Sequence, residues 1–144
     1  MRVLFLDFDG VLHPGPDVAS SLAHWCWLPL LTRLLATHAD VRVVVHSTWR
    51  HDHDLDELRA LLCGIGERVI AATERVGRLE GIERWLEAHP EVSSHRILDD
   101  DEGDFFYPLP AQLILFDSAQ GISDERTQHQ LRAWLAETTS ERRN

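Results

Sequence analysis

The chain has 144 residues, of which 44% are hydrophobic, and this favours one folded domain at residues 1–144 over a disordered chain. The 14 basic and 24 acidic residues give a net charge of −10, which opposes tight binding to the phosphate backbone of a nucleic acid. No apolar run is long enough to span a membrane, and no signal-peptide pattern is present. Two cysteines are too few for a disulfide framework, so we expect a cytoplasmic protein with reduced thiols.

The first predicted element is a strand at residues 3–6, an apolar, branched run that is short enough to be buried on both faces. Two carboxylates follow at Asp7 and Asp9, and then comes Gly10, which can adopt the backbone angles of a sharp turn. Acids this close together repel one another unless a cation joins them. Mg²⁺ accepts oxygen ligands of this kind, so the stretch predicts a metal site, with an acidic turn as the alternative.

Helices and strands alternate through the rest of the chain. The first secure helix begins at Pro29, and a side-chain cap is expected at Asp52 or Asp54 for the second helix and at Ser123 for the last. The loop before Pro29 contains His13, whose position could overhang a site but whose role the sequence does not define. The later strands are predicted at residues 41–45, 69–71, 96–98 and 113–116. The first three helices are expected to end near His38, at Gly64 and before Pro90. The polar tail 138–144 is expected to fray.

Strands that alternate with helices predict an α/β fold with a parallel sheet and right-handed crossovers. Ligands in such folds bind beyond the carboxyl ends of the strands. Three predicted strands end in polar residues, which are Asp7 with Asp9, the run 46–48, and Asp99 with Asp100. Folding alone does not require this coincidence, so we expect the three strand ends to build one site.

The order of these motifs resembles that of the haloacid dehalogenase (HAD) superfamily, in which Asp-x-Asp-Gly follows an N-terminal hydrophobic strand. Residues 7–10, 47–48 and 97–100 match its first, second and fourth motifs. The runs 46–50 and 121–123 are similar to the capless HAD domains of Swiss Army knife RNA-repair proteins. The resemblance implies a Rossmann-like three-layer α/β/α fold with a five-stranded parallel sheet in the order 5-4-1-2-3 and no cap domain.

The same resemblance implies a Mg²⁺-dependent phosphomonoester hydrolase that acts through an aspartyl-phosphate. Asp7 would be the nucleophile, and Asp9 would be the general acid and base and would also give the metal its main-chain carbonyl. Ser47 would contact the phosphoryl group, with Thr48 as the alternative. The remaining assignments are Asp99 and Asp100 as further metal ligands, and Gly10 and Arg50 as substrate contacts.

The third motif of the family is a basic residue, typically lysine, at the start of the helix before strand four. The sequence contains no lysine. Arg78 is the candidate for this role because it lies where that helix is expected to begin, and Arg75 is the alternative. An arginine can neutralise carboxylate and phosphate together, but it does not replace lysine without consequence. A solvated helix arginine is the competing interpretation of either residue.

The spacing between motifs leaves no room for a cap domain, so we expect an open site that accepts a bulky phosphoester. A phosphorylated small molecule or a nucleic-acid end would be the substrate, although the negative charge opposes the latter. The alternative is a non-catalytic, metal-binding interaction domain, which the missing lysine favours. We expect no membrane partner, and the sequence leaves the oligomeric state open.

Overall fold

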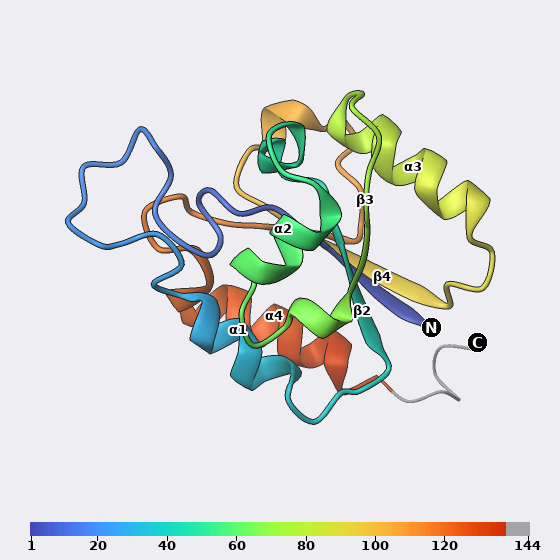
Figure 1. Ribbon diagram of the computed structural model, residues 1–144, viewed down its shortest axis with the longest axis horizontal. Helices are drawn as coiled ribbons and strands as arrows, with labels where there is room; N and C mark the ends of the chain where they lie inside the picture. Colours follow the sequence, from blue (N-terminus) through green and yellow to red (C-terminus); the bar gives the residue numbers. More distant parts are fainter. Residues whose placement is uncertain (138–144) are drawn as a thin grey trace.

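The computed structural model describes residues 1–137 and contains a five-stranded parallel sheet with helices on both faces (Figure 1). The strands are β1 (Arg2–Leu6), β2 (Val41–Val45), β3 (Val69–Ala72), β4 (Ser94–Asp99) and β5 (Leu113–Leu115). The helices are α1 (Leu28–Leu35), α2 (Leu55–Leu61), α3 (Arg78–Ala88) and α4 (Glu125–Leu135). The strands are ordered β3-β2-β1-β4-β5, which is the predicted order 5-4-1-2-3 read from the other edge. The predicted fold class is therefore confirmed.

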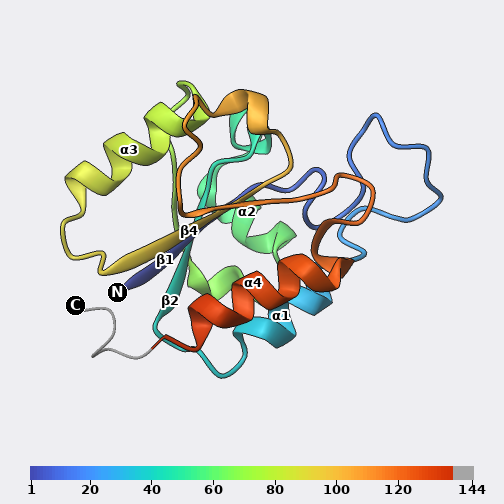
Figure 2. The same cartoon turned by 180° about the vertical axis from the view of Figure 1, so that it is seen from behind.

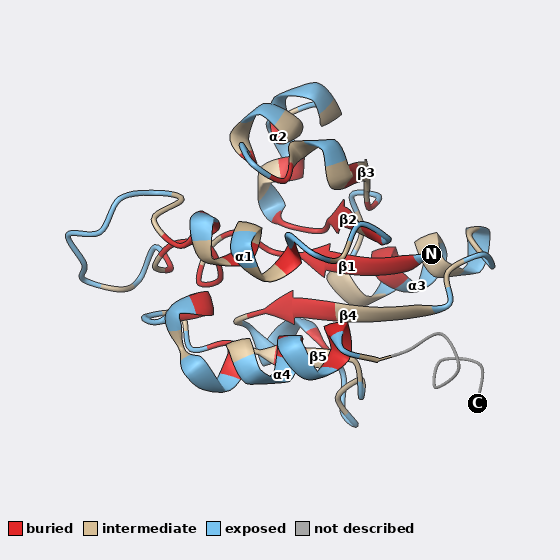
Figure 3. Ribbon diagram, turned by 90° about the horizontal axis from the view of Figure 1, so that it is seen from below, coloured by how far each residue is buried: buried red, intermediate tan, exposed pale blue. Residues whose placement is uncertain are grey.

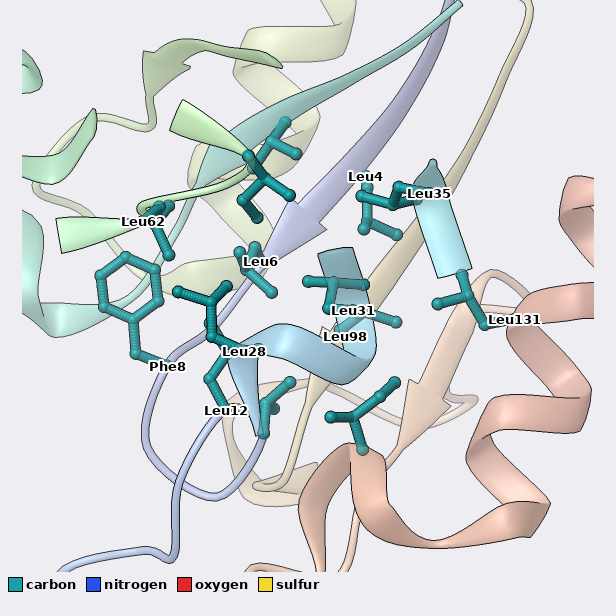
Figure 4. Close-up of a cluster of buried hydrophobic side chains, with 14 of the residues drawn as sticks. Leu4, Leu6, Phe8, Leu12, Leu28, Leu31, Leu35, Leu62, Leu98 and Leu131 are labelled. Carbon is teal, nitrogen blue, oxygen red and sulfur yellow. The ribbon is translucent and has the colours of Figure 1, made fainter. Parts of the chain in front are cut away.

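β1 lies at the centre of the sheet, and all of its residues are buried (Figure 3). Its side chains alternate between two cores. Leu4 and Leu6 face a cluster formed with α1, α2 and α4, in which Leu31 of α1 and Leu131 of α4 also take part (Figure 4). Val3 and Phe5 face the opposite side, where α3 packs, and Figure 2 shows α3 across the sheet from α1 and α4.

The connections between the strands contain no inserted cap domain. The link from β1 to β2 consists of a long loop and α1, and the link from β3 to β4 contains α3. This agrees with the expectation from motif spacing. Among residues 1–137, no helix combines the length and the apolar character that crossing a bilayer requires.

The predicted helix boundaries need three corrections. α1 ends at Leu35 rather than near His38, and α2 ends at Leu61 rather than at Gly64. The cap of α4 is Asp124, whose carboxylate accepts from the Arg126 backbone N–H at 2.9 Å, and not Ser123. Ser123 lies instead in a short 3₁₀ turn, η4 (Gly121–Ser123), that precedes the helix.

The cap of α2 resolves the choice that the sequence left open. Asp54, not Asp52, caps this helix in a reciprocal pair with Glu57. The tail expected to fray, residues 138–144, lies outside the described residues.

Candidate active site at the carboxyl edge of the sheet

Three carboxylates meet beyond the carboxyl ends of β1 and β4. Asp7 follows β1 directly, and its backbone N–H donates to the Leu98 carbonyl at 3.1 Å, which extends the pairing of the two strands. Asp99 ends β4 and Asp100 follows it. One oxygen from each of the three carboxylates lies within 4.8 Å of the others. The structure therefore brings together acids that are more than ninety residues apart in the sequence, as the motif order predicted.

Arg78, the first residue of α3, lies against these acids. Its Nη1 is 3.1 Å from Asp7 Oδ2 and 2.6 Å from Asp99 Oδ2, and its Nε is 3.1 Å from Asp104 Oδ2. Arg75, the alternative candidate for this position, is exposed and donates to the His51 carbonyl at 2.6 Å. Of the two candidate arginines, the structure brings Arg78 to the acids and not Arg75.

Burial and mutual repulsion disturb the ionisation of the cluster. Burial raises the pKa of Asp7 well above its ordinary value, and the neighbouring charge of Asp99 raises it further although Arg78 opposes this. Burial likewise raises the pKa of Asp100 to about 6, with a contribution from Asp99. The pKa of Asp99 is lowered. Burial alone would raise it, but the hydrogen bond with His46, whose Nε2 is 2.9 Å away, and the charge of Arg78 outweigh burial.

The cluster fits a hard divalent cation. Its donors are carboxylate oxygens, which Mg²⁺ prefers, and they lie close enough to share one ion. Among residues 1–137, Arg78 is the one arginine that forms ion pairs within the cluster of Asp7, Asp99 and Asp100, so three carboxylates share a single paired guanidinium. A bound cation would relieve the repulsion that raises the pKa values of Asp7 and Asp100.

Gly10 allows Asp100 to reach the cluster. Its φ of +77° lies in the left-handed region, and a Cβ at this position would collide with the Asp100 carboxylate. The backbone must therefore lack a side chain here so that Asp100, a candidate metal ligand, can pack over it. The substrate contact predicted for Gly10 stays a prediction.

Ser47 and Thr48 follow β2 and differ in burial. Ser47 is fully buried, and its Oγ accepts from the Trp49 backbone N–H at 3.2 Å, which caps the 3₁₀ turn η1 (Thr48–His51). Thr48 is exposed. A phosphoryl contact by either residue stays a prediction.

Arg50 has a different environment from the one expected. Its guanidinium is buried and donates to four backbone carbonyls: His46 and Ser47 beside β2, and Glu74 and Val76 before α3. In the structure, Arg50 links two backbone segments, and the substrate contact predicted from sequence stays a prediction. Through this link, Arg50 ties the end of β2 to the segment that leads to Arg78.

Because Arg50 holds two backbone segments together, Arg50→Ala is expected to destabilise the fold. We expect it to lower the free energy of unfolding by about 2–4 kcal/mol, because it leaves buried carbonyls without donors. Urea unfolding in EDTA measures the change. The control is Arg84→Ala on the exposed surface of α3, where loss of ion pairs that solvent screens should change stability much less. Equal stability of the two variants would contradict the structural role of Arg50.

Two side chains to which the sequence assigned no defined role at the site contact Asp9. His13 Nε2 lies 2.7 Å from Asp9 Oδ1, and the Trp49 indole Nε1 lies 3.3 Å from both carboxylate oxygens. Burial lowers the pKa of His13, although the hydrogen bond with Asp9 opposes this. Neither contact has a signal in the hydrophobic pattern, because both depend on how the loops after β1 and β2 fold.

Comparison with known proteins gives one family. A family model described as the HAD domain in Swiss Army Knife RNA repair proteins matches residues 3–127. The match extends from β1 into α4 and includes every residue of the acidic cluster as well as Arg78. No curated protein matches the chain significantly.

Proposed function

The chain belongs to the family of HAD domains in Swiss Army Knife RNA repair proteins, and from this we propose that it is a Mg²⁺-dependent phosphomonoester hydrolase that acts through an aspartyl-phosphate. The observation that carries the proposal is the buried Asp7 carboxylate, which lies beside the Arg78 guanidinium and within one metal-sized cluster of acids. A phosphoryl-transfer site needs this combination of a nucleophile, a cation and a place for metal.

In the proposed first step, a carboxylate oxygen of Asp7 attacks phosphorus and the bond from phosphorus to the leaving oxygen breaks. Asp9 gives a proton to that oxygen as it leaves. In the second step, Asp9 takes a proton from water, which attacks the aspartyl-phosphate and releases inorganic phosphate. Arg78, 3.1 Å from Asp7, would stabilise the charge on the transferring group in both steps.

The metal would be held by the carboxylates of Asp7, Asp99 and Asp100, with the main-chain carbonyl of Asp9 as a further ligand. When bound, Mg²⁺ supplies positive charge to the phosphoryl oxygens and keeps the nucleophile and the phosphate together. The Asp9 side chain is 32% exposed, and the strand connections within residues 1–137 contain no inserted cap that would enclose a substrate. This favours a protruding phosphoester, such as a phosphorylated nucleic-acid end, over a small metabolite enclosed by a lid.

The chain's net charge of −10 opposes binding to a long polynucleotide, so within the nucleic-acid version of the proposal a short phosphorylated end is the better substrate. Screening nucleotides, sugar phosphates and phosphate-ended RNA and DNA would identify the preferred class. A specificity constant for RNA ends no higher than that for sugar phosphates would argue against the nucleic-acid version of the proposal.

A non-catalytic metal-binding domain is the second candidate. The observation that favours it is the arginine in place of the family's lysine, because Arg78 is already paired with Asp7, Asp99 and Asp104. Hydrolysis of p-nitrophenyl phosphate separates the two functions. We expect turnover that requires Mg²⁺ and stops in EDTA, whereas metal binding without turnover of any phosphoester would favour the second candidate.

A further inference from the structure

The Asp9 carboxylate is held by side chains from two separate loops. His13, in the loop after β1, contacts Oδ1 at 2.7 Å, and Trp49, in η1, lies 3.3 Å from each oxygen. The Asp9 side chain remains 32% exposed. Its carboxylate is therefore restrained by protein donors and still open to a substrate.

The contacts of His13 define its tautomer. The Nδ1 atom accepts a hydrogen bond from the Trp25 backbone N–H at 3.2 Å. An amide N–H can only donate, so Nδ1 must carry a lone pair and the ring proton of the neutral imidazole must lie on Nε2. Nε2 therefore donates to Asp9, and each ring nitrogen has the partner that this tautomer needs.

The surrounding loop holds the ring in place. The His13 side chain is only 1% exposed, and its ring stacks on that of His24 with centroids 4.6 Å apart and meets the edge of Trp25 at 5.1 Å. Trp25, which supplies the N–H to Nδ1, has a φ of +66°. A left-handed backbone is uncommon at a bulky residue and persists only where the surroundings impose it. The loop thus uses an unfavourable conformation that presents a donor to His13.

We propose that His13 is a positioning residue for Asp9, holding Oδ1 through Nε2–H so that Oδ2 presents the transferable proton to the leaving oxygen. This inference rests on the proposed phosphomonoesterase activity. As the Asp7–phosphorus bond forms, the bond to the leaving oxygen breaks, its electron pair stays on that oxygen, and the proton moves to it from Oδ2. The alcohol leaves neutral, and the Nε2–H donor stabilises the ionised carboxylate that remains on Asp9.

The choice of ester tests this role. The p-nitrophenolate ion leaves well without a proton, whereas the alkoxide from benzyl phosphate is a poor leaving group and depends on the acid. Loss of the His13 donor should therefore impair cleavage of benzyl phosphate much more than cleavage of p-nitrophenyl phosphate. The constant kcat/KM is the quantity to compare, because it covers only the steps up to departure of the alcohol. General loosening of the site would lower both constants alike.

Two variants of His13 form a matched pair. The side chain of His13→Asn can accept from the Trp25 N–H but is too short to reach Asp9, and that of His13→Gln can place an N–H near the position of Nε2. We expect His13→Asn to lose about 10- to 100-fold in kcat/KM for benzyl phosphate, with a several-fold smaller loss for p-nitrophenyl phosphate. His13→Gln should recover most of the loss on benzyl phosphate.

Each result has a defined meaning. If the wild type cleaves both esters but His13→Asn is equally impaired on both, or on neither, the positioning role is overturned while the proposed function stands. If the wild type cleaves neither ester nor any phosphoester of the substrate screen, the proposed function fails and the role fails with it. ¹⁵N NMR of the His13 ring in the wild type provides a readout that does not need turnover. A proton on Nε2 is expected, and a proton on Nδ1 would overturn the inference.

Discussion

Asp7→Asn is expected to reduce Mg²⁺-dependent turnover of p-nitrophenyl phosphate by about 10⁴- to 10⁶-fold, because the amide cannot act as the nucleophile. The variant should not lose stability in the absence of metal. In the wild type, burial and repulsion from Asp99 raise the pKa of Asp7, which shows that its charged form is disfavoured in the folded protein. Removing that charge should leave the melting temperature in EDTA unchanged or higher.

The matched control is Asp101→Asn, the same chemical change in the same acidic run. Asp101 is exposed and caps the 3₁₀ turn η3 (Glu102–Asp104) through a hydrogen bond from the Gly103 backbone N–H, which asparagine can also accept. Its activity should stay near that of the wild type. Activity that survives in Asp7→Asn, or that persists in EDTA, contradicts the aspartyl-phosphate mechanism.

Arg78→Ala is expected to lower kcat/KM by about 10²- to 10³-fold, since one charged donor to the transferring group is lost. The variant should be destabilised in EDTA, because the removal leaves the buried carboxylates of Asp7 and Asp99 without their cation. Saturating Mg²⁺ should restore much of this stability. Turnover is therefore measured at a Mg²⁺ concentration at which thermal unfolding shows the variant to be folded.

Two further substitutions locate the effect. Arg78→Lys keeps the charge but cannot reproduce the forked contacts with Asp7, Asp99 and Asp104, so it should recover only part of the activity. Arg75→Ala should have little effect, because that side chain is exposed and contacts only a backbone carbonyl among the interactions described. A loss in Arg75→Ala with near-normal turnover in Arg78→Ala would transfer the role to Arg75.

The fold was predictable because its strands are short apolar runs and its acids follow those runs directly. The alternation of side chains along β2 could also have predicted where His46 lies. Val44 of β2 packs on the α3 face of the sheet, and two residues later His46 contacts Asp99 beside Arg78. Period-two spacing extends to this residue beyond the end of the strand, so it could have placed His46 on the side of α3.

The loops could not be predicted in the same way. The contact of His13 with Asp9 depends on a left-handed backbone at Trp25, and hydrophobic spacing has no signal for that conformation. The contacts of Arg50 depend on two backbone segments that only the folded chain brings together. The cap of α4 is Asp124 and not the predicted Ser123, because a turn that includes Ser123 precedes the helix.

The central claim is that acids from the ends of two strands share one metal ion and that Asp7 is free to bond to phosphorus. A crystal structure of the protein with Mg²⁺ and beryllium trifluoride, which mimics a phosphoryl group on a carboxylate, tests both parts at once. We predict beryllium bonded to a carboxylate oxygen of Asp7, the metal ligated by Asp7 and Asp100, and Arg78 in contact with fluoride. Metal bound away from the two acids, or beryllium trifluoride absent from Asp7 at saturating concentration, would contradict the account.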